Sequence, residues 1–150
     1  MFLIRKATIN DAELLFNWAN DEKVRANAIR PQKIVWDDHI KWLNHKLAFS
    51  HYVLILEKDE IPVGQIRFDF HAEENGWVIT YSISFENRGK NWGKVIVALG
   101  MKYINKFPII AYVRPSNVPS LKIFESLKFK KNMVNKEGTD LVKFVIDEFN

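Results

Sequence analysis

Three apolar runs in the middle of the chain constrain its fold more than any other feature. They are HYVLILEK at 51–58, IPVGQIRFDF at 61–70 and GWVITYSISF at 76–85, and short polar turns separate them. Strands joined by such short connections pair antiparallel, so the runs predict a β-meander. In the third run apolar side chains alternate with increasingly polar ones. This alternation predicts one face against a core and one polar face.

The segment after the meander predicts a crossover. A helix is expected at about 92–106 and a short buried strand at 109–113. Strand, helix and strand make a βαβ unit, so 76–85 and 109–113 are expected to be parallel or splayed neighbours. A further helix at 116–127 and a hairpin at 129–149 follow. The sheet is therefore mixed.

The N-terminal third predicts one strand and three helices. Residues 2–7 alternate apolar and polar side chains and read as the first strand. Thr8 and Asp11 resemble a capping box that starts a helix. A short helix at 21–27 and a longer one at 36–47 follow, the latter with apolar residues at helical spacing.

Composition is consistent with one α+β domain over residues 1–150, with a mixed, mostly antiparallel sheet flanked by helices. A chain that is 47% hydrophobic and 27% charged is typical of a globular protein. No apolar run reaches the roughly 18–20 residues of a membrane span, and the opening MFLIRK predicts no signal peptide. Cysteine is absent, which excludes a thiol nucleophile and disulfides and favours a cytoplasmic location.

Positive charge is concentrated in one stretch of the chain. Between Asn87 and Phe124 there is no Asp or Glu, and seven Lys and Arg residues fall there. Such a block attracts phosphate-bearing molecules, although a solvated helix face or a nucleic-acid surface has the same composition. The choice depends on the turn at the start of the block.

That turn is Arg88-Gly-Lys-Asn-Trp-Gly-Lys94, and it leads from a strand into a helix. A glycine-rich turn at a helix N-terminus aims free backbone N–H groups and the helix dipole at one point, which forms an anion site. Asn91 is the non-glycine residue that best tolerates a positive φ. The mononucleotide P-loop and the dinucleotide fingerprint are both excluded, since neither Gly-Lys-Ser/Thr nor the later ribose-binding acid is present.

Two motifs resemble those of the GCN5-related N-acetyltransferases (GNAT). Arg88-Gly-Lys-Asn-Trp-Gly93 resembles the family's Arg/Gln-x-x-Gly-x-Gly/Ala turn, with Asn91 where glycine is usual. The later stretch Asn117-Val-Pro-Ser120-Leu-Lys-Ile-Phe124-Glu-Ser-Leu127-Lys-Phe129 resembles the second signature, Asn-x-x-Ser/Ala-x-x-x-Tyr/Phe-x-x-x-Gly-Phe. The resemblance covers nearly the whole chain. It implies the GNAT fold with splayed central strands, and acetyl-coenzyme A as cofactor.

The resemblance also assigns a cofactor site. The strand before the turn would bond the pantetheine arm through the main chain of Ile83, Ser84 and Phe85. Asn117 and Ser120 would contact the cofactor arm, although both types also cap helices. Phe124, at the family's tyrosine position, is also expected to contact the cofactor. The pyrophosphate would lie on the backbone amides of the turn, which are those of Arg88, Gly89, Lys90, Asn91, Trp92, Gly93 and Lys94.

The catalytic groups are less evident in the sequence. The family's usual proton donor is a tyrosine, and Phe124 stands in its place. Tyr112 and Tyr81 are the alternative donors, and each can equally be a core aromatic. The carboxylates or imidazoles nearest the third strand run are Asp69, His71 and Glu86. Without an evident base, an amine of pKa near 8 is a better acceptor than a lysine of pKa about 10.4.

The acceptor region resembles one branch of the family, the N-acetyltransferases of UDP-linked 4-amino sugars in the pseudaminic acid pathway. The matching segments begin at Trp18, at Trp36 and at Gly64. This implies an amine acceptor such as a UDP-amino sugar. The candidate contacts, which can also be structural residues, are Asn20, Arg25, Arg30, Trp36 and Asp69.

Other functions stay open at this stage. An N-terminal-amine acetyltransferase shares the Trp-x-Asn-Asp segment, and a non-catalytic acyl-CoA-binding module fits the missing tyrosine. No nucleic-acid, membrane or metal role is expected. His39 and His45 lie six residues apart, which does not place them on one helix face. A homodimer is compatible with the sequence.

Overall fold

The computed structural model describes residues 1–49 and 51–149 and contains one seven-stranded sheet. The strand order is β1-β2-β3-β4-β5-β7-β6, and only β4 and β5 pair in parallel. The strands are β1 (Phe2–Lys6), β2 (Tyr52–Lys58), β3 (Ile61–His71), β4 (Gly76–Ile83), β5 (Ile109–Val113), β6 (Lys130–Lys136) and β7 (Thr139–Ile146). The predicted α+β class, meander and C-terminal hairpin are therefore confirmed.

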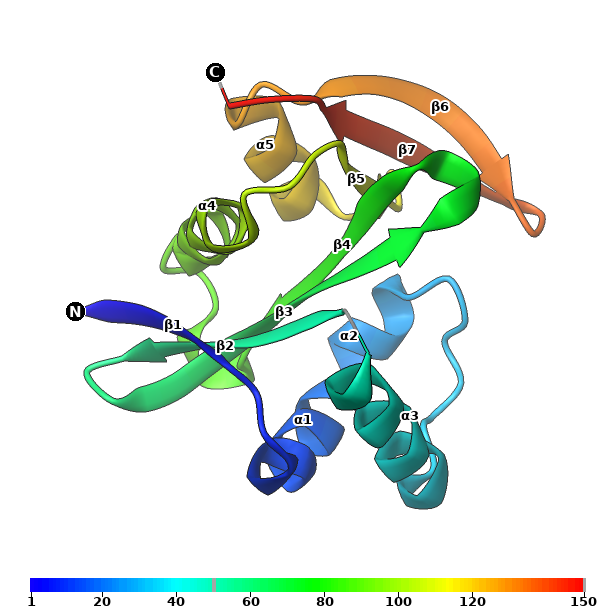
Figure 1. Ribbon diagram of the computed structural model, residues 1–150. Helices are drawn as coiled ribbons and strands as arrows, with labels where there is room; N and C mark the ends of the chain where they lie inside the picture. Colours follow the sequence, from blue (N-terminus) through cyan, green and yellow to red (C-terminus); the bar gives the residue numbers. More distant parts are fainter. Residues whose placement is uncertain (50, 150) are drawn as a thin grey trace.

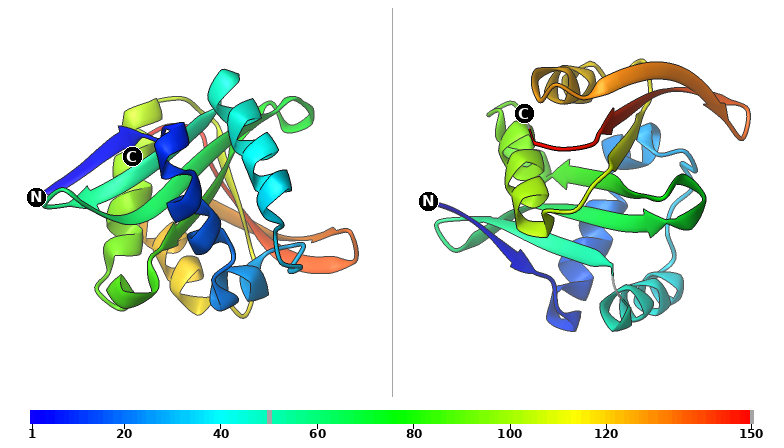
Figure 2. Two further views of the ribbon diagram at one scale, coloured as in Figure 1. Left: turned by 90° about the horizontal axis from the view of Figure 1, so that it is seen from below. Right: turned by 45° about the horizontal axis from the view of Figure 1, so that its top comes forward.

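Helices cover both faces of this sheet (Figures 1 and 2). One face carries α4 and α5, and the other carries the N-terminal helices. Among the described residues, no helix is long and apolar enough to cross a membrane. The α-helices are α1 (Ala12–Ala19), α2 (Glu22–Asn27), α3 (Trp36–Ala48), α4 (Trp92–Ile104) and α5 (Val118–Ser126), and short 3-10 turns span Ile9–Asp11, Ala72–Glu74 and Phe85–Asn87.

The central strands β4 and β5 separate soon after they meet. Their parallel register joins Trp77 to Ile109 and Val78 to Ile110, and it goes no further. Beyond Val78 the two strands diverge, so a wedge-shaped gap opens between them toward the start of α4. The predicted splay is confirmed. This gap has unpaired strand edges on both sides, which is where an extended ligand can add as a further strand.

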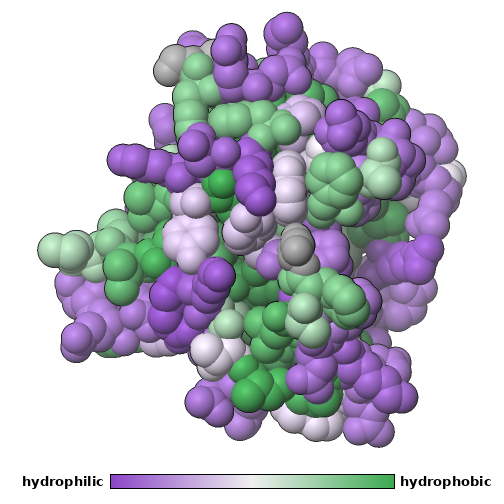
Figure 3. All heavy atoms as spheres, viewed as in Figure 1, coloured by the Kyte–Doolittle hydropathy of each residue, from purple (hydrophilic) through white to green (hydrophobic). Residues whose placement is uncertain are grey.

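Two clusters of buried side chains hold the layers together. The larger lies under α4 and α5 and includes Phe68, Phe124 and Phe144, each at most 1% exposed. The smaller fixes α1 and α3 to β2 through residues such as Leu15 and Leu43. Hydrophilic side chains cover most of the rim of the face in Figure 3, and apolar ones reach the surface mainly toward its middle and at the N-terminal edge.

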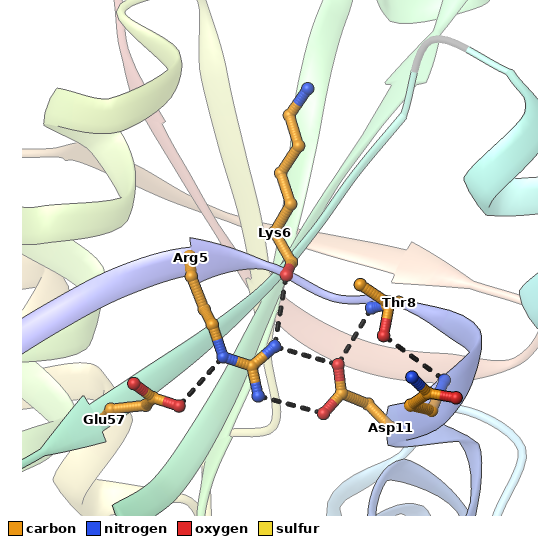
Figure 4. Close-up of polar contacts among 6 residues, drawn as sticks. Arg5, Lys6, Thr8, Asp11 and Glu57 are labelled. Atoms are coloured by element: carbon orange, nitrogen blue, oxygen red, sulfur yellow. Dashed lines mark hydrogen bonds and ion pairs between the residues drawn. The ribbon is translucent and has the colours of Figure 1, made fainter. Parts of the chain in front are cut away.

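A charged network fixes the start of the N-terminal helices (Figure 4). Asp11 accepts two bonds from the Arg5 guanidinium, each of 2.9 Å, and one from the Thr8 N–H at 2.8 Å. Arg5 also binds Glu57 on β2 at 2.9 Å. The predicted capping box is confirmed. It joins β1, β2 and the first helix at one corner, which sets the angle at which α1 crosses the sheet.

Candidate functional site

The turn before α4 has the geometry of an anion site. Gly89 and Asn91 both adopt positive φ, 80° and 63°, which turns successive N–H groups toward the open end of the helix. Asn91 is the N-cap of α4, but its side chain makes no capping hydrogen bond. The first turn of α4 therefore keeps its amides free for a ligand. The predicted role of Asn91 as the residue that tolerates this conformation is confirmed.

Glycine is required at position 93 for a different physical reason than at position 89. A Cβ at Gly89 would meet nothing within 4 Å, whereas a Cβ at Gly93 would lie 2.8 Å from the Ile123 side chain and 3.5 Å from the Tyr81 ring. Gly93 thus permits close packing of α4 on α5 and β4. A substitution at Gly93 would disturb this packing as well as any ligand at the turn.

The main chain of β4 faces the gap at alternate residues. Ser84 donates its N–H to a carbonyl of the β3 side at 2.9 Å, and Trp77 donates in the opposite direction, to Pro108 before β5, at 2.9 Å. Because ladder bonds alternate along a strand, Tyr81 and Ile83 share the direction of Trp77. Their N–H groups therefore point into the gap between β4 and β5.

Ser84 and Phe85 do not offer the strand edge predicted for them. β4 ends at Ile83, and Ser84 uses its N–H toward β3 and its carbonyl to accept from Asn87 at 3.0 Å. Phe85 begins a 3-10 turn with a side chain that is 74% exposed. The prediction that the strand continues to residue 85 is wrong, because the chain must turn early to bring Arg88 back under the strand end.

Arg88 connects the turn to the N-terminal helices. Its Nε donates to the Ile83 carbonyl at 3.0 Å, and its Nη2 binds Asp21 at 2.9 Å. Asp21 in turn caps α2. Burial acts to raise the pKa of Asp21, but Arg88 and the N–H groups of Val24 and Lys23 together outweigh it and hold the pKa below its usual range. A cleft of about 190 Å³ lies beside this bridge, lined by Asn17, Trp18, Asp21, Ser82, Ile83, Phe85, Glu86 and Arg88.

The residues of the second motif lie on the opposite side of the gap. Asn117 is the N-cap of α5, and its side chain makes no capping bond, so helix capping does not account for it. Ser120 is 7% exposed, and its hydroxyl lies 2.6 Å from the Tyr81 hydroxyl. This pair spans from β4 to α5, and burial raises the pKa of Tyr81.

Phe124 is not part of the cofactor surface. It is 1% exposed and packs on Tyr81, Phe129 and Phe144, with ring centroids 6.1, 5.1 and 5.4 Å away. The prediction that Phe124 contacts the cofactor is therefore wrong, because its side chain is buried in the core. Lys128, which occupies the glycine position of the same motif, adopts the positive φ of 68° that a glycine would supply.

The Tyr112 hydroxyl is bound to a carboxylate away from the turn 88–94. Its hydroxyl donates to Glu74 at the β3–β4 connection, and Lys143 binds the same carboxylate at 3.0 Å. Burial and the bond to Glu74 raise the pKa of Tyr112. Of the two predicted tyrosines, only Tyr81 lies beside the gap with a partner from the second motif.

The candidate bases differ in their surroundings. Asp69 is 9% exposed, and its ion pairs with Arg67 and Lys46 outweigh the opposing effect of burial and hold its pKa below the usual range. Asp69 is therefore a poor proton acceptor. His71 lies near Glu73 at the β3–β4 connection, and Glu86 lines the cleft beside β4.

The predicted acceptor residues do not form one surface. Asn20 holds the main chain of Ile34 with two bonds, of 2.8 and 2.7 Å. Arg30 is exposed and pairs with Glu137 at 2.7 Å. Both therefore make structural contacts, Asn20 from before α2 and Arg30 from within the loop after it. Trp36 packs against Phe16 with centroids 5.1 Å apart and is 41% exposed.

Arg25 is the predicted acceptor residue that faces the interior of this region. Its Nη1 donates to the carbonyls of Arg30 and Gln32 at 3.2 and 3.1 Å. Arg114, at the end of β5, donates twice to the Ala28 carbonyl, at 3.2 and 2.6 Å. The loop 28–35 is thus fixed from two sides. The sequence did not reveal the roles of Asp21, Lys46 and Arg114, because each acts through a partner distant in the chain. The role of Arg67 was also missed, although its partner Asp69 is only two residues away.

One group of potential metal ligands occurs among the described residues. The ligand atoms of His71, Glu73 and Glu74 lie within 4.8 Å of one another. Glu74 already accepts from Tyr112 and Lys143, which supplies the positive charge that a metal would bring. We assign no metal to it.

Known proteins of similar sequence are acetyltransferases or uncharacterized proteins. The model of the acetyltransferase (GNAT) domain matches residues 2–130. Uncharacterized N-acetyltransferase p20 of Bacillus licheniformis is 28% identical over 143 residues, which are 85% of this chain and 78% of p20. Protein MJ1062 of Methanocaldococcus jannaschii, also uncharacterized, is 27% identical over 142 residues. The match covers 91% of this chain but 29% of that longer protein.

Solved structures share the same architecture at low sequence identity. YncA of Salmonella typhimurium, described as a putative acetyltransferase with its cofactor acetyl-CoA, has a TM-score of 0.81 at 17% identity over 98% of this chain and 94% of its own. Spermidine N-acetyltransferase of Vibrio cholerae, in complex with CoA and spermine, has a TM-score of 0.83 at 14% identity, over 98% of this chain and 95% of its own. Ribosomal-protein-alanine N-acetyltransferase of Brucella melitensis has a TM-score of 0.81 at 20% identity, over 97% of this chain and 99% of its own.

Proposed function

The chain belongs to the acetyltransferase (GNAT) domain family, and on that premise we propose that it transfers an acetyl group to the 4-amino group of a nucleotide-linked amino sugar. The enzyme class, an N-acetyltransferase, and the cofactor, acetyl-coenzyme A, come with the family. The acceptor, the site residues and the proton donor are our proposal. The observation that carries it is the turn at Arg88–Lys94, with its two positive φ values beside the gap between β4 and β5.

The residues around the gap fit acetyl-coenzyme A. The amides of the turn and of the first turn of α4 would hold the pyrophosphate, and no side chain blocks the approach at Gly89. Lys90 and Lys94 stand at the same helix end, and among the described residues neither has an ion-pair partner. The N–H groups of Tyr81 and Ile83 would bond the pantetheine arm as an added strand. Asn117 would bond it from the side of α5.

The reaction joins the acetyl carbon to the amine nitrogen, breaks the thioester bond and requires a proton on the departing sulfur. We propose that Tyr81 supplies this proton, because its hydroxyl lies beside the gap and burial keeps it protonated at neutral pH. Ser120 orients the hydroxyl through their 2.6 Å contact. The N–H of Ile83 can donate to the carbonyl oxygen as negative charge develops there.

An amine that ionises near neutral pH suits this site. Asp69 is held ionised by two cations, so Glu86 is the one predicted base that faces the cleft beside β4. An amine of pKa near 8 is partly neutral at pH 7 and needs little help from a base, whereas a lysine of pKa about 10.4 is almost entirely protonated. A ring amine of a sugar belongs to the easier class.

The test is thiol release from acetyl-coenzyme A with a panel of UDP-linked 4-amino sugars, N-terminal alanine peptides and free lysine. We expect turnover with at least one amino sugar at a kcat/KM at least tenfold above that of the peptides. Preference for the peptides would instead support the second candidate, an N-terminal-amine acetyltransferase. This candidate is favoured by the likeness to the ribosomal-protein-alanine enzyme of Brucella melitensis.

A third outcome is tight cofactor binding without thiol release on any amine. It would indicate a non-catalytic acyl-CoA-binding module, which the buried Phe124 at the tyrosine position favours. Isothermal titration with coenzyme A, run beside the thiol assay, separates this outcome from a protein that binds no cofactor.

A further inference from the structure

Two cations bind one carboxylate on the polar face of β3, and a third cation lies near them. Asp69 binds Lys46 Nζ and Arg67 Nε at 2.8 Å each. Arg25 reaches the same region from α2, where burial and then the like charge of Arg67 lower the pKa of Arg25. Among the described residues, Arg25 has no carboxylate partner. One negative charge thus faces three positive ones, and two positive charges are left unbalanced.

One buried hydrogen-bond donor of this cluster is unused, and a second guanidinium binds its carboxylate through one nitrogen. The Nε of Arg25 is buried and has no hydrogen-bond partner. Arg67 uses its Nε for Asp69, and within the described part of the chain its terminal amino groups bind no carboxylate. The Arg67 guanidinium lies over the Trp42 ring at 5.0 Å, which fixes the plane of the group. Buried donors without acceptors cost free energy, and phosphate or carboxylate oxygens would satisfy them.

His51 lies in the same region of positive electrostatic potential. Its Nδ1 lies 3.5 Å from Asp69. Burial and then the charge of Lys46 lower the pKa of His51, although Asp69 acts in the opposite sense. The positive side chains therefore dominate the potential here even with the carboxylate in place.

The cluster lies beside the place where β4 and β5 separate. In the β3–β4 register Arg67 is opposite Thr80, and Asp69 is opposite Val78. Val78 is the last residue of β4 in the parallel pair with β5, so the gap opens one strand away from the cluster. Side chains directly opposite each other on neighbouring strands have Cβ atoms about 5 Å apart. An acceptor could thus reach the gap and the cluster at once.

We infer that Arg25, Lys46 and Arg67 form a subsite for an anionic group of the acceptor, a phosphate or a carboxylate. The inference rests on the proposed function and assigns the residues that would bind the anionic part of its acceptor. It replaces Arg30, which is exposed and paired with Glu137, by Arg67 and Lys46. It also sets this chain apart from the spermidine N-acetyltransferase whose fold it shares, since a polycation would be repelled by the cluster.

The test is anion binding to protein already saturated with coenzyme A, which blocks the separate anion site at α4. UDP and succinate are titrated separately by calorimetry. We expect wild-type protein to bind at least one of them, and Arg67→Gln and Arg25→Gln to bind it at least tenfold more weakly. Arg30→Gln, a neighbouring arginine outside the cluster, should change the affinity less than twofold. Binding of UDP alone indicates a phosphate-bearing acceptor, and binding of succinate alone a carboxylate-bearing one.

A variant of opposite sign keeps the inference falsifiable if Arg67→Gln folds poorly. Asp69→Asn removes the one negative charge of the cluster and should bind the same anion several-fold more tightly. No binding of either anion, or equal losses in Arg67→Gln and Arg30→Gln, would overturn the subsite. Normal coenzyme A affinity in the same experiment leaves the proposed function intact. If coenzyme A itself does not bind, the proposed function fails, and the same variants titrated without it still decide the subsite.

Discussion

The donor side and the acceptor side of this molecule are built in different ways. The donor side comprises the turn 88–94 and the N-termini of α4 and α5, and its ligand groups are mainly backbone amides set by local φ values. The acceptor side comprises α1 to α3, the loop 28–35 and the polar face of β3. There, side chains are held by partners far along the chain, such as Lys46 by Asp69 and Arg114 by Ala28.

This difference explains how the two sides can change independently. Backbone amides recognise the cofactor whatever side chains surround them, so the donor side depends on a few positions where the main chain must turn. The acceptor side can be altered by exchanging one ion pair or one loop contact without disturbing that turn. Arg88 is the main bridge between the two, through its contacts with Ile83 and Asp21.

The largest effect is expected from a charge placed in the turn. Gly89→Asp should weaken coenzyme A binding about 1,000-fold, or about 4 kcal/mol, because its carboxylate would face the pyrophosphate. The space around Gly89 is open, and Asp and Asn are the side chains that best tolerate its positive φ, so this variant and its control Gly89→Asn should both fold with the same small strain. In the control, the asparagine has the shape of the aspartate without its charge and tolerates the same φ. Its affinity for coenzyme A should fall less than about fivefold. Equal losses measured by calorimetry for both variants would contradict an anion site at the turn.

Next comes the proton donor on the donor side. Tyr81→Phe should lower kcat about 100-fold with little change in the KM for acetyl-coenzyme A. Tyr112→Phe should change kcat less than about threefold, because its hydroxyl is bound to Glu74 away from the gap. Steady-state thiol release measures both. A larger loss in Tyr112→Phe than in Tyr81→Phe would reverse the assignment.

A smaller effect is expected on the acceptor side from the clamp between Asn20 and Ile34. Asn20→Ala removes both hydrogen bonds and should destabilise the protein by about 1–2 kcal/mol. Release of the loop should raise the acceptor KM about tenfold, or about 1.4 kcal/mol, and leave the KM for acetyl-coenzyme A unchanged. Asn44→Ala, an exposed asparagine on α3, is the control. A change in both KM values would show that the two sides are not separable.

The smallest effect concerns the corner that anchors α1. The bonds from Arg5 outweigh burial and hold the pKa of Asp11 below its usual range. A carboxyl whose pKa is lowered by folding stabilises the protein above its unfolded pKa of about 3.9, and this contribution is lost as the pH falls toward the folded value. Asp11→Asn should therefore cost about 1 kcal/mol at pH 7. Urea unfolding at pH 7 and pH 3 should show this difference shrinking at the lower pH. A constant difference would argue against the ion pair.

Sequence by itself determined the fold and most of the donor side. Alternation, turn residues and the capping box at Thr8 and Asp11 are local patterns, and so is the preference of Asn91 for positive φ. The residues that form these features are neighbours in the chain, which is why short motifs reveal them. The early end of β4 at Ile83 was missed because the apolar and polar alternation continues to Phe85, whereas the chain already enters a 3-10 turn in which Asn87 donates to the Ser84 carbonyl.

Only the tertiary structure decided the roles of the acceptor-side residues. Asn20 and Arg30 have side chains suited to ligand binding or to structural contacts alike, and their partners lie 14 and 107 residues away. No local pattern indicates that Lys46 and Arg67 share the Asp69 carboxylate or that Arg25 lies near them, since the three cations come from three different elements. Charge balance in a partly buried cluster depends on which side chains meet in space. That meeting is fixed by strand register and helix packing, which no local pattern contains.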